Sequence, residues 1–234
     1  PAELIGALAS PALTFGLWIG AGAVVLAGAV TFGELAAHYP VAGGLHVYLR
    51  EAWGERVACL YGWQSLLIMD PGVTAALAVG AAQYLLLIWP AAQGSERPIA
   101  CVVIWALAIL TVAGLRMGAR VFGIMTAVKL ATLGAIMLLA FMSADGNWAH
   151  FSSPGGRPAT APPVGEALAL GLVGVFFSFG GFWEASRITG EMRDPRRTLP
   201  RAFVIGVATV TAIYLVTTPA FIYLVPPSGT ATAP

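Results

Sequence analysis

The feature that most constrains the fold of this sequence is a set of long runs without a charged residue. A helix needs about 20 mostly apolar residues to cross a hydrocarbon core about 30 Å thick. Four runs without Asp, Glu, Lys or Arg approach or exceed that length: residues 4–33, 71–95, 98–115 and 202–234. Two further apolar stretches carry interior charges, Lys129 in one and Glu166 and Glu184 in the other. The sequence therefore predicts an all-α protein with several membrane-spanning helices.

The composition agrees with lipid as the main solvent. Hydrophobic residues make up 58% of the chain and charged residues 10%, whereas soluble domains carry about 25% charged residues. A soluble chain of this composition could not present polar helix faces to water. We therefore expect a multi-pass protein of the cell membrane, surrounded by the lipid bilayer.

Several classes of function have no support in the sequence. The net charge of +1 gives no reason to expect a nucleic acid partner. Cys59 and Cys101 are isolated in apolar surroundings, so they predict neither a metal site nor a disulfide framework. No Ser-His-Asp order, zinc-protease motif or phosphate-binding loop is present. We expect no enzyme activity, no cofactor and no metal.

The apolar runs predict six spans after an apolar remnant at residues 1–8: 12–36, 56–89, 98–115, 120–143, 164–190 and 200–225. Because cytoplasmic loops retain Lys and Arg, the loop arginines predict the orientation. Nine of them fall on one side: Arg50, Arg56, Arg116, Arg120, Arg187, Arg193, Arg196, Arg197 and Arg201. Only Arg97 and Arg157 fall on the other side. The side with nine arginines is predicted to be cytoplasmic, with both ends of the chain outside.

A connection rich in Pro, Gly and Ser at residues 144–163 divides the predicted spans. It is typical of an exposed loop, and the orientation makes it extracellular. Residues 1–143 precede it and residues 164–234 follow it. Because the chain begins at Pro1 rather than Met and without a cleavable leader, we also expect it to be part of a longer protein.

The most informative motif is a pair of adjacent glycines, Gly180 and Gly181, inside an aromatic-rich span. Glycine weakens a helix by about 1 kcal/mol relative to alanine, so the pair favours local unwinding. Unwound backbone at membrane depth is tolerated where it lines a watery cavity, and its free amides and carbonyls can bind a small zwitterion. The alternative is close helix packing through small residues. The candidate binding residues are Phe177, Ser178, Phe179, Gly180, Gly181 and Phe182.

Two charged residues inside spans are further candidates. Lys129 lies well within an apolar span, where a lysine is costly unless it faces a cavity or a partner. The alternative is that its long stem reaches toward the interface. Asp70 precedes Pro71, which removes a backbone donor and loosens the helix. We expect Asp70 either to serve transport or to line an outer vestibule.

Three groups of residues together resemble the amino acid, polyamine and organocation transporter superfamily. Its sixth span and following loop resemble FSFGGF at 177–182 and GEMRDPRRTLPRA at 190–202. Its signature loop after span 2 is similar to GEL at 33–35, YPVAGG at 39–44 and YLREAWG at 48–54. Span 3 of the L-type amino acid transporter branch is similar to WQSLLIMDP at 63–71.

The resemblance implies a fold of five plus five helices in inverted repeats, with spans 1 and 6 unwound around the substrate. This chain would run from the end of span 1 through span 7. By the same resemblance, Phe177 matches an aromatic gate and the segment 178–182 the unwound backbone. Lys129 matches a lysine that replaces a sodium ion in sodium-independent branches. Trp183 and Glu184 depart from the family pattern, so they remain only possible contributors.

The function that the resemblance implies is secondary active transport of amino acids by alternating access. Transport would be independent of sodium, with proton coupling or substrate exchange left open. Polyamines and other organocations are alternative substrates. A sensor or interaction subunit on the same scaffold is the alternative from another class. The expected partners are a small-molecule substrate, the bilayer and, with coupling, protons.

Overall fold

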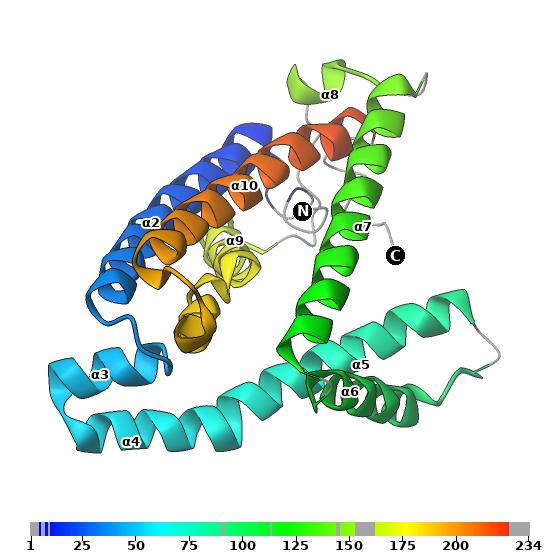
Figure 1. Ribbon diagram of the computed structural model, residues 1–234. Helices are drawn as coiled ribbons and strands as arrows, with labels where there is room; N and C mark the ends of the chain where they lie inside the picture. Colours follow the sequence, from blue (N-terminus) through cyan, green and yellow to red (C-terminus); the bar gives the residue numbers. More distant parts are fainter. Residues whose placement is uncertain are drawn as a thin grey trace. The chain divides into compact units, whose positions relative to one another are not determined.

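The chain divides into two compact units in the computed structural model, which describes residues 5, 8, 10–89, 92–112, 114–143, 146–152 and 162–224. The first unit comprises Pro1–Tyr48 and Thr132–Pro234, and the second comprises Leu49–Ala131. Every regular element of the described residues is helical (Figure 1), which confirms the predicted all-α class. The elements are α2 (Pro11–His38), α3 (Leu45–Trp53), α4 (Glu55–Gln64), the π-helix η1 (Ser65–Met69), α5 (Asp70–Ile88), α6 (Glu96–Val112), α7 (Leu115–Met142), α8 (Ala149–Ser152), α9 (Val164–Phe179), the 3-10 helix η3 (Phe182–Glu191) and α10 (Pro195–Leu224).

Five helical stretches of the described chain are long and apolar enough to cross a membrane. They are Pro11–His38, Glu55–Ile88, Met117–Met142, Val164–Glu191 and Pro195–Leu224. Each coincides with a predicted span. Helices alone do not fix which end faces the cytoplasm, so the predicted orientation stays a prediction. The division into inverted repeats about residues 144–163 also stays a prediction.

The remaining predicted span, residues 98–115, lies slightly earlier in the chain, at Glu96–Val112. It forms α6, which has 17 residues and is about 25 Å long at 1.5 Å per residue. That length is at the lower limit for a spanning helix. Gly114 just beyond it has a φ of 104°, a left-handed value that a continuing helix does not adopt. The helix therefore ends before the predicted boundary.

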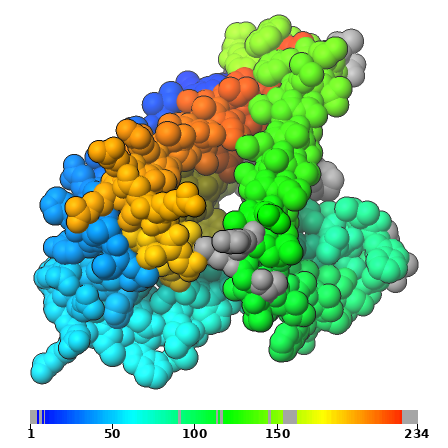
Figure 2. Space-filling view, in the orientation of Figure 1, coloured from blue at the N-terminus to red at the C-terminus, as the bar shows by residue number. Residues whose placement is uncertain are grey.

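In the first unit, α2 packs closely along α10 at two glycines. A Cβ atom built on Gly22 would lie 2.9 Å from Cγ2 of Thr211. One on Gly33 would lie 3.0 Å from Cα of Pro200. Small residues let helix backbones approach in this way inside membranes, where packing rather than apolar burial drives association. In Figure 2 the blue surface of α2 adjoins the orange surface at the start of α10.

This packing predicts that Gly33→Leu destabilises the protein. The added side chain would overlap Cα and Cβ of Pro200, and overpacking of this kind costs about 1–3 kcal/mol. Thermal unfolding of the purified full-length protein should show a lowered Tm. Gly20→Leu is the matched control, because it lies on the same helix with nothing within 4 Å of a built Cβ. Equal Tm values for the two variants would contradict the packing.

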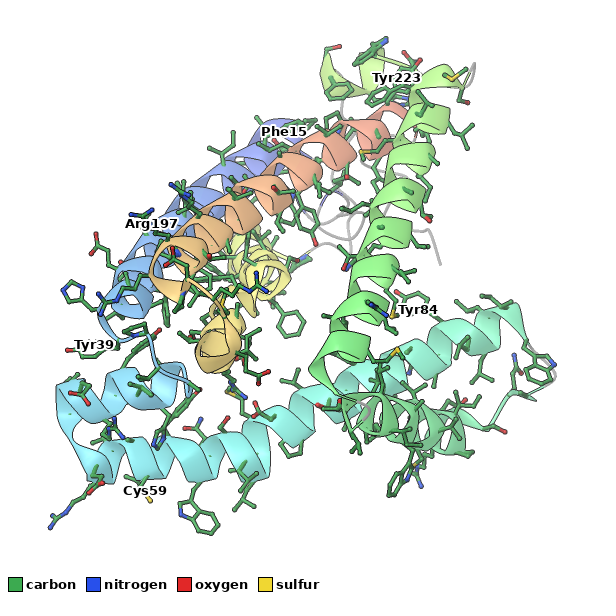
Figure 3. All side chains as sticks on the ribbon, in the orientation of Figure 1. Phe15, Tyr39, Cys59, Tyr84, Arg197 and Tyr223 are labelled. Atoms are coloured by element: carbon green, nitrogen blue, oxygen red, sulfur yellow. The ribbon has the colours of Figure 1, made fainter. Side chains whose placement is uncertain are left out.

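The far end of α10 is held by the short helix α8. The amide of Asn147 donates to the carbonyl of Tyr223 at 2.9 Å, and Nδ1 of His150 lies 3.0 Å from the carbonyl oxygen of Ile222. The Tyr223 ring, labelled in Figure 3, lies 4.8 Å from the ring of Trp148. These contacts hold the last turn of α10 in place.

Candidate functional site

The predicted interruption of the sixth-span segment lies at the two glycines. Helix α9 ends at Phe179, and Gly180 leaves the helix with φ −56° and ψ 146°. Gly181 then adopts φ 94° and ψ −4°, in the left-handed region that favours glycine. The chain resumes as the 3-10 helix η3. The paired glycines therefore break the helix, as the sequence predicted, and their role in binding stays a prediction.

The break leaves several backbone groups available. The amide of Gly180 donates to the carbonyl of Phe177 at 3.0 Å. Among the described residues, however, no hydrogen bond of ordinary length and angle reaches the amides of residues 181–183 or the carbonyls of residues 178–180. The amides belong to the N-terminal end of η3, and the carbonyls to the C-terminal end of α9. Helix dipoles favour negative charge at the N-terminal end of η3 and positive charge at the C-terminal end of α9.

Aromatic side chains anchor the chain on both sides of the break. Before it, the ring of Phe179 packs edge-on against Trp18 of α2, with centroids 6.1 Å apart. Trp18 in turn stacks on Tyr214 of α10 at 4.0 Å. After the break, the ring of Phe182 lies 5.8 Å from Phe32 of α2. The two halves of the broken helix are thus held separately, so the break does not depend on the glycines alone.

The two other predicted residues before the glycines are Phe177 and Ser178. Phe177 is 73% exposed. The hydroxyl of Ser178 donates to the carbonyl of Gly174 at 2.9 Å, one turn earlier in α9. For a ligand at the break, Ser178 therefore has its backbone carbonyl available rather than its hydroxyl.

The two residues that depart from the family pattern have local partners. The ring of Trp183 lies 6.4 Å from that of Phe32 and 5.1 Å from that of Phe182. The carboxylate of Glu184 pairs with Nε of Arg187 at 2.6 Å. This ion pair gives Glu184 a function within η3 that needs no ligand.

Asp70 lies in the second unit, directly after the π-helix η1. Its amide donates to the carbonyl of Ser65, and the Ser65 hydroxyl donates to Oδ2 of Asp70 at 3.0 Å. The helix is thus wider in the turn before Pro71, which agrees with the loosening predicted there. Such π-turns are frequent at functional sites.

Lys129 lies on α7, also in the second unit, and its side chain is exposed. The structure thus brings together the residues from Phe177 to Glu184 in the first unit. It does not relate them to Asp70 or Lys129. The roles predicted for both charged residues stay predictions.

Sequence reasoning missed the aromatic anchors on the neighbouring helices. Trp18 and Phe32 of α2 and Tyr214 and Phe203 of α10 flank the break through ring contacts. Their only signal in the sequence is a large ring within a span rich in glycine and alanine. That signal does not say which helix each ring contacts.

These features define a multi-pass α-helical membrane protein built around a discontinuous helix. The family described as amino acid permease matches residues 2–233. The chain belongs to this family. The match confirms the resemblance inferred from the motifs, and with the five spanning helices it confirms a multi-pass protein of the cell membrane.

Several similar relatives are named as transporters or exchangers. A serine/threonine exchanger of Bacillus subtilis is 27% identical over 198 residues, which cover 85% of this chain and 44% of the relative. The b(0,+)-type amino acid transporter 1 of Mus musculus is 31% identical, covering 91% of this chain and 44% of the relative. The Asc-type amino acid transporter 1 of Mus musculus is 30% identical, covering 91% and 41%. The chain therefore spans less than half the length of these relatives.

Proposed function

We propose that the protein to which this chain belongs carries amino acids across the membrane by alternating access. The observation that carries the proposal is the break at Gly180–Gly181, with free amides on one side and free carbonyls on the other. An amino acid has a carboxylate and an ammonium group on one carbon. The amides of 181–183 suit the carboxylate, and the carbonyls of 178–180 suit the ammonium.

The names of the relatives support the same proposal. One is a serine/threonine exchanger and two are amino acid transporters. Because the backbone at the break would bind only the groups that all amino acids share, side-chain preference would come from other residues. The protein would act as a transporter and not as an enzyme.

We further propose that transport does not use sodium. Lys129 would supply a fixed positive charge where a sodium ion would otherwise hold backbone carbonyls. The driving force would then be either a proton gradient or exchange against an internal amino acid. Proton coupling requires a proton gradient and exchange requires an internal amino acid, so one experiment separates the two mechanisms.

The test is uptake of labelled amino acids by the full-length protein in liposomes. We expect saturable uptake of at least one amino acid without a sodium gradient. A requirement for internal amino acid would indicate exchange, and stimulation by an inward proton gradient would indicate coupling. Binding without any flux would favour a sensor. Uptake of polyamines alone would show that the substrates are polyamines rather than amino acids. Uptake that requires sodium would contradict the role given to Lys129.

A further inference from the structure

The loop after α2 docks against the second half of the broken helix. We call residues 39–48, which include the first turn of α3, the latch. Gly44 has a φ of 54°, and a Cβ built on it would lie 2.7 Å from Oγ of Ser186. A Cβ built on Gly190 would lie 3.2 Å from Cβ of Ala42. Glycine is thus needed at position 44, whereas a Cβ atom at position 190 would require Ala42 to shift by a few tenths of an ångström.

Polar groups buried at this contact are paired. Ser186 and Thr189 of η3 are each 1% exposed, and Tyr48 of the latch is 6% exposed. The Ser186 hydroxyl donates to the carbonyl of Trp183 at 2.6 Å, and that of Thr189 donates to the carbonyl of Ser186. The Tyr48 phenol interacts with the Ser186 side chain. The Ser186 and Thr189 hydroxyls are paired within η3, so separating the latch from η3 would remove only the partner of the buried Tyr48 phenol, which is unfavourable.

The Tyr48 phenol remains a neutral group under physiological conditions. Burial raises its pKa above the ordinary value of 10.0, although the hydrogen bond with Ser186 opposes the shift. The contact therefore does not titrate near neutral pH.

The latch also connects to the break itself. The ring of Phe32 lies 6.2 Å from that of Tyr48 and 5.8 Å from that of Phe182, the first residue after the glycines. A single aromatic side chain thus links the latch to the end of η3 that carries the free amides. Tyr39, at the start of the latch, is labelled in Figure 3.

We propose that the latch is a positioning element that keeps η3 fixed to α2, so that the latch and η3 move as one body while the break opens and closes. This inference rests on the proposed transport function. Because the latch and η3 move together, the substrate route never opens between them. Tyr48 acts as a positioning residue, because it sets the place of the amides through Ser186 and Phe32.

A disulfide across the contact tests this directly. Ala42→Cys and Gly190→Cys bring two Cβ atoms to within a few tenths of an ångström of the spacing found in disulfides. Gly190 does not have a positive φ, so its backbone accepts a cysteine. The pair is made in the full-length protein after Cys59, Cys101 and any other native cysteine are replaced by serine. The two single-cysteine variants are the oxidation controls.

The expected result is near-complete disulfide formation with uptake equal before and after oxidation. Loss of uptake on oxidation, restored by reductant, would overturn the inference, since the contact would then have to open. Failure of the disulfide to form would also overturn it. If even the wild-type protein takes up no amino acid or amine, the proposed function fails instead, and the disulfide yield still decides whether the contact exists.

A second variant separates positioning from a purely structural role. Tyr48→Phe removes only the hydroxyl, and loss of one such hydrogen bond should raise the KM for uptake about fivefold. Adding the oxidised disulfide between positions 42 and 190 to this variant should restore the KM. An unchanged KM in Tyr48→Phe, or a raised KM that the disulfide does not rescue, would contradict the positioning role.

Discussion

Replacing Gly181 by valine is expected to reduce amino acid uptake by the full-length protein strongly while leaving it inserted in the membrane. Gly181 has φ 94° and ψ −4°, and left-handed backbone costs an L-residue about 1–2 kcal/mol, more when it is β-branched. The strain drives this residue toward helical angles, which would reorient the amides of 181–183. Because about 1.4 kcal/mol corresponds to a factor of ten, initial uptake rates in proteoliposomes should fall at least about tenfold.

The matched control is Gly174→Ala, seven residues earlier and inside α9. Nothing lies within 4 Å of a Cβ built at Gly174, and alanine favours a helix over glycine by about 1 kcal/mol. Uptake by this variant should equal that of the wild type. Wild-type uptake by Gly181→Val, at equal amounts of inserted protein, would show that the break is not needed for transport.

Replacing Lys129 by alanine is expected to cause the second largest loss of uptake, without unfolding the protein. Its ammonium is proposed to hold backbone carbonyls that a sodium ion would otherwise hold. Leaving such groups unpaired costs about 1–3 kcal/mol, which corresponds to a fall in uptake of roughly 5- to 150-fold. The measurement is uptake in liposomes, with size-exclusion chromatography of the purified variant to check folding.

Two further variants at this position make the test specific. Lys129→Met keeps an unbranched apolar stem without the charge and should lose uptake as alanine does. Lys129→Arg keeps the charge but misplaces it, because a planar guanidinium does not replace a compact ammonium. If Lys129→Ala matches the wild type in rate and pH dependence, the lysine merely extends its stem toward the membrane interface.

The break could be predicted from the sequence because its cause is local. Two adjacent glycines inside an apolar span lower helix stability wherever the span packs, and Gly181 indeed takes a conformation that few other residues adopt. The loosening before Pro71 was predictable for a similar reason, since proline removes a backbone donor. The end of α6 was less predictable, because a continuous apolar run conceals the turn that Gly114 makes.

The surroundings of the break could not be predicted, because they depend on contacts between distant segments. Nothing near Phe179 in the sequence indicates that Trp18 and Tyr214 will flank it. The glycine of the YPVAGG motif at position 44 likewise has its explanation 142 residues later, at Ser186. Local propensity predicts where a chain bends, whereas only tertiary packing decides what holds the bend.

A structure of the full-length protein with a transported amino acid bound would show directly whether the substrate binds at the break. We expect the ligand to lie at the break between Phe179 and Phe182. Its carboxylate should accept hydrogen bonds from the amides of 181–183, and its ammonium should donate to carbonyls of 178–180. An amino acid bound elsewhere, or a continuous helix through Gly180 and Gly181 in the bound state, would contradict substrate binding at the break.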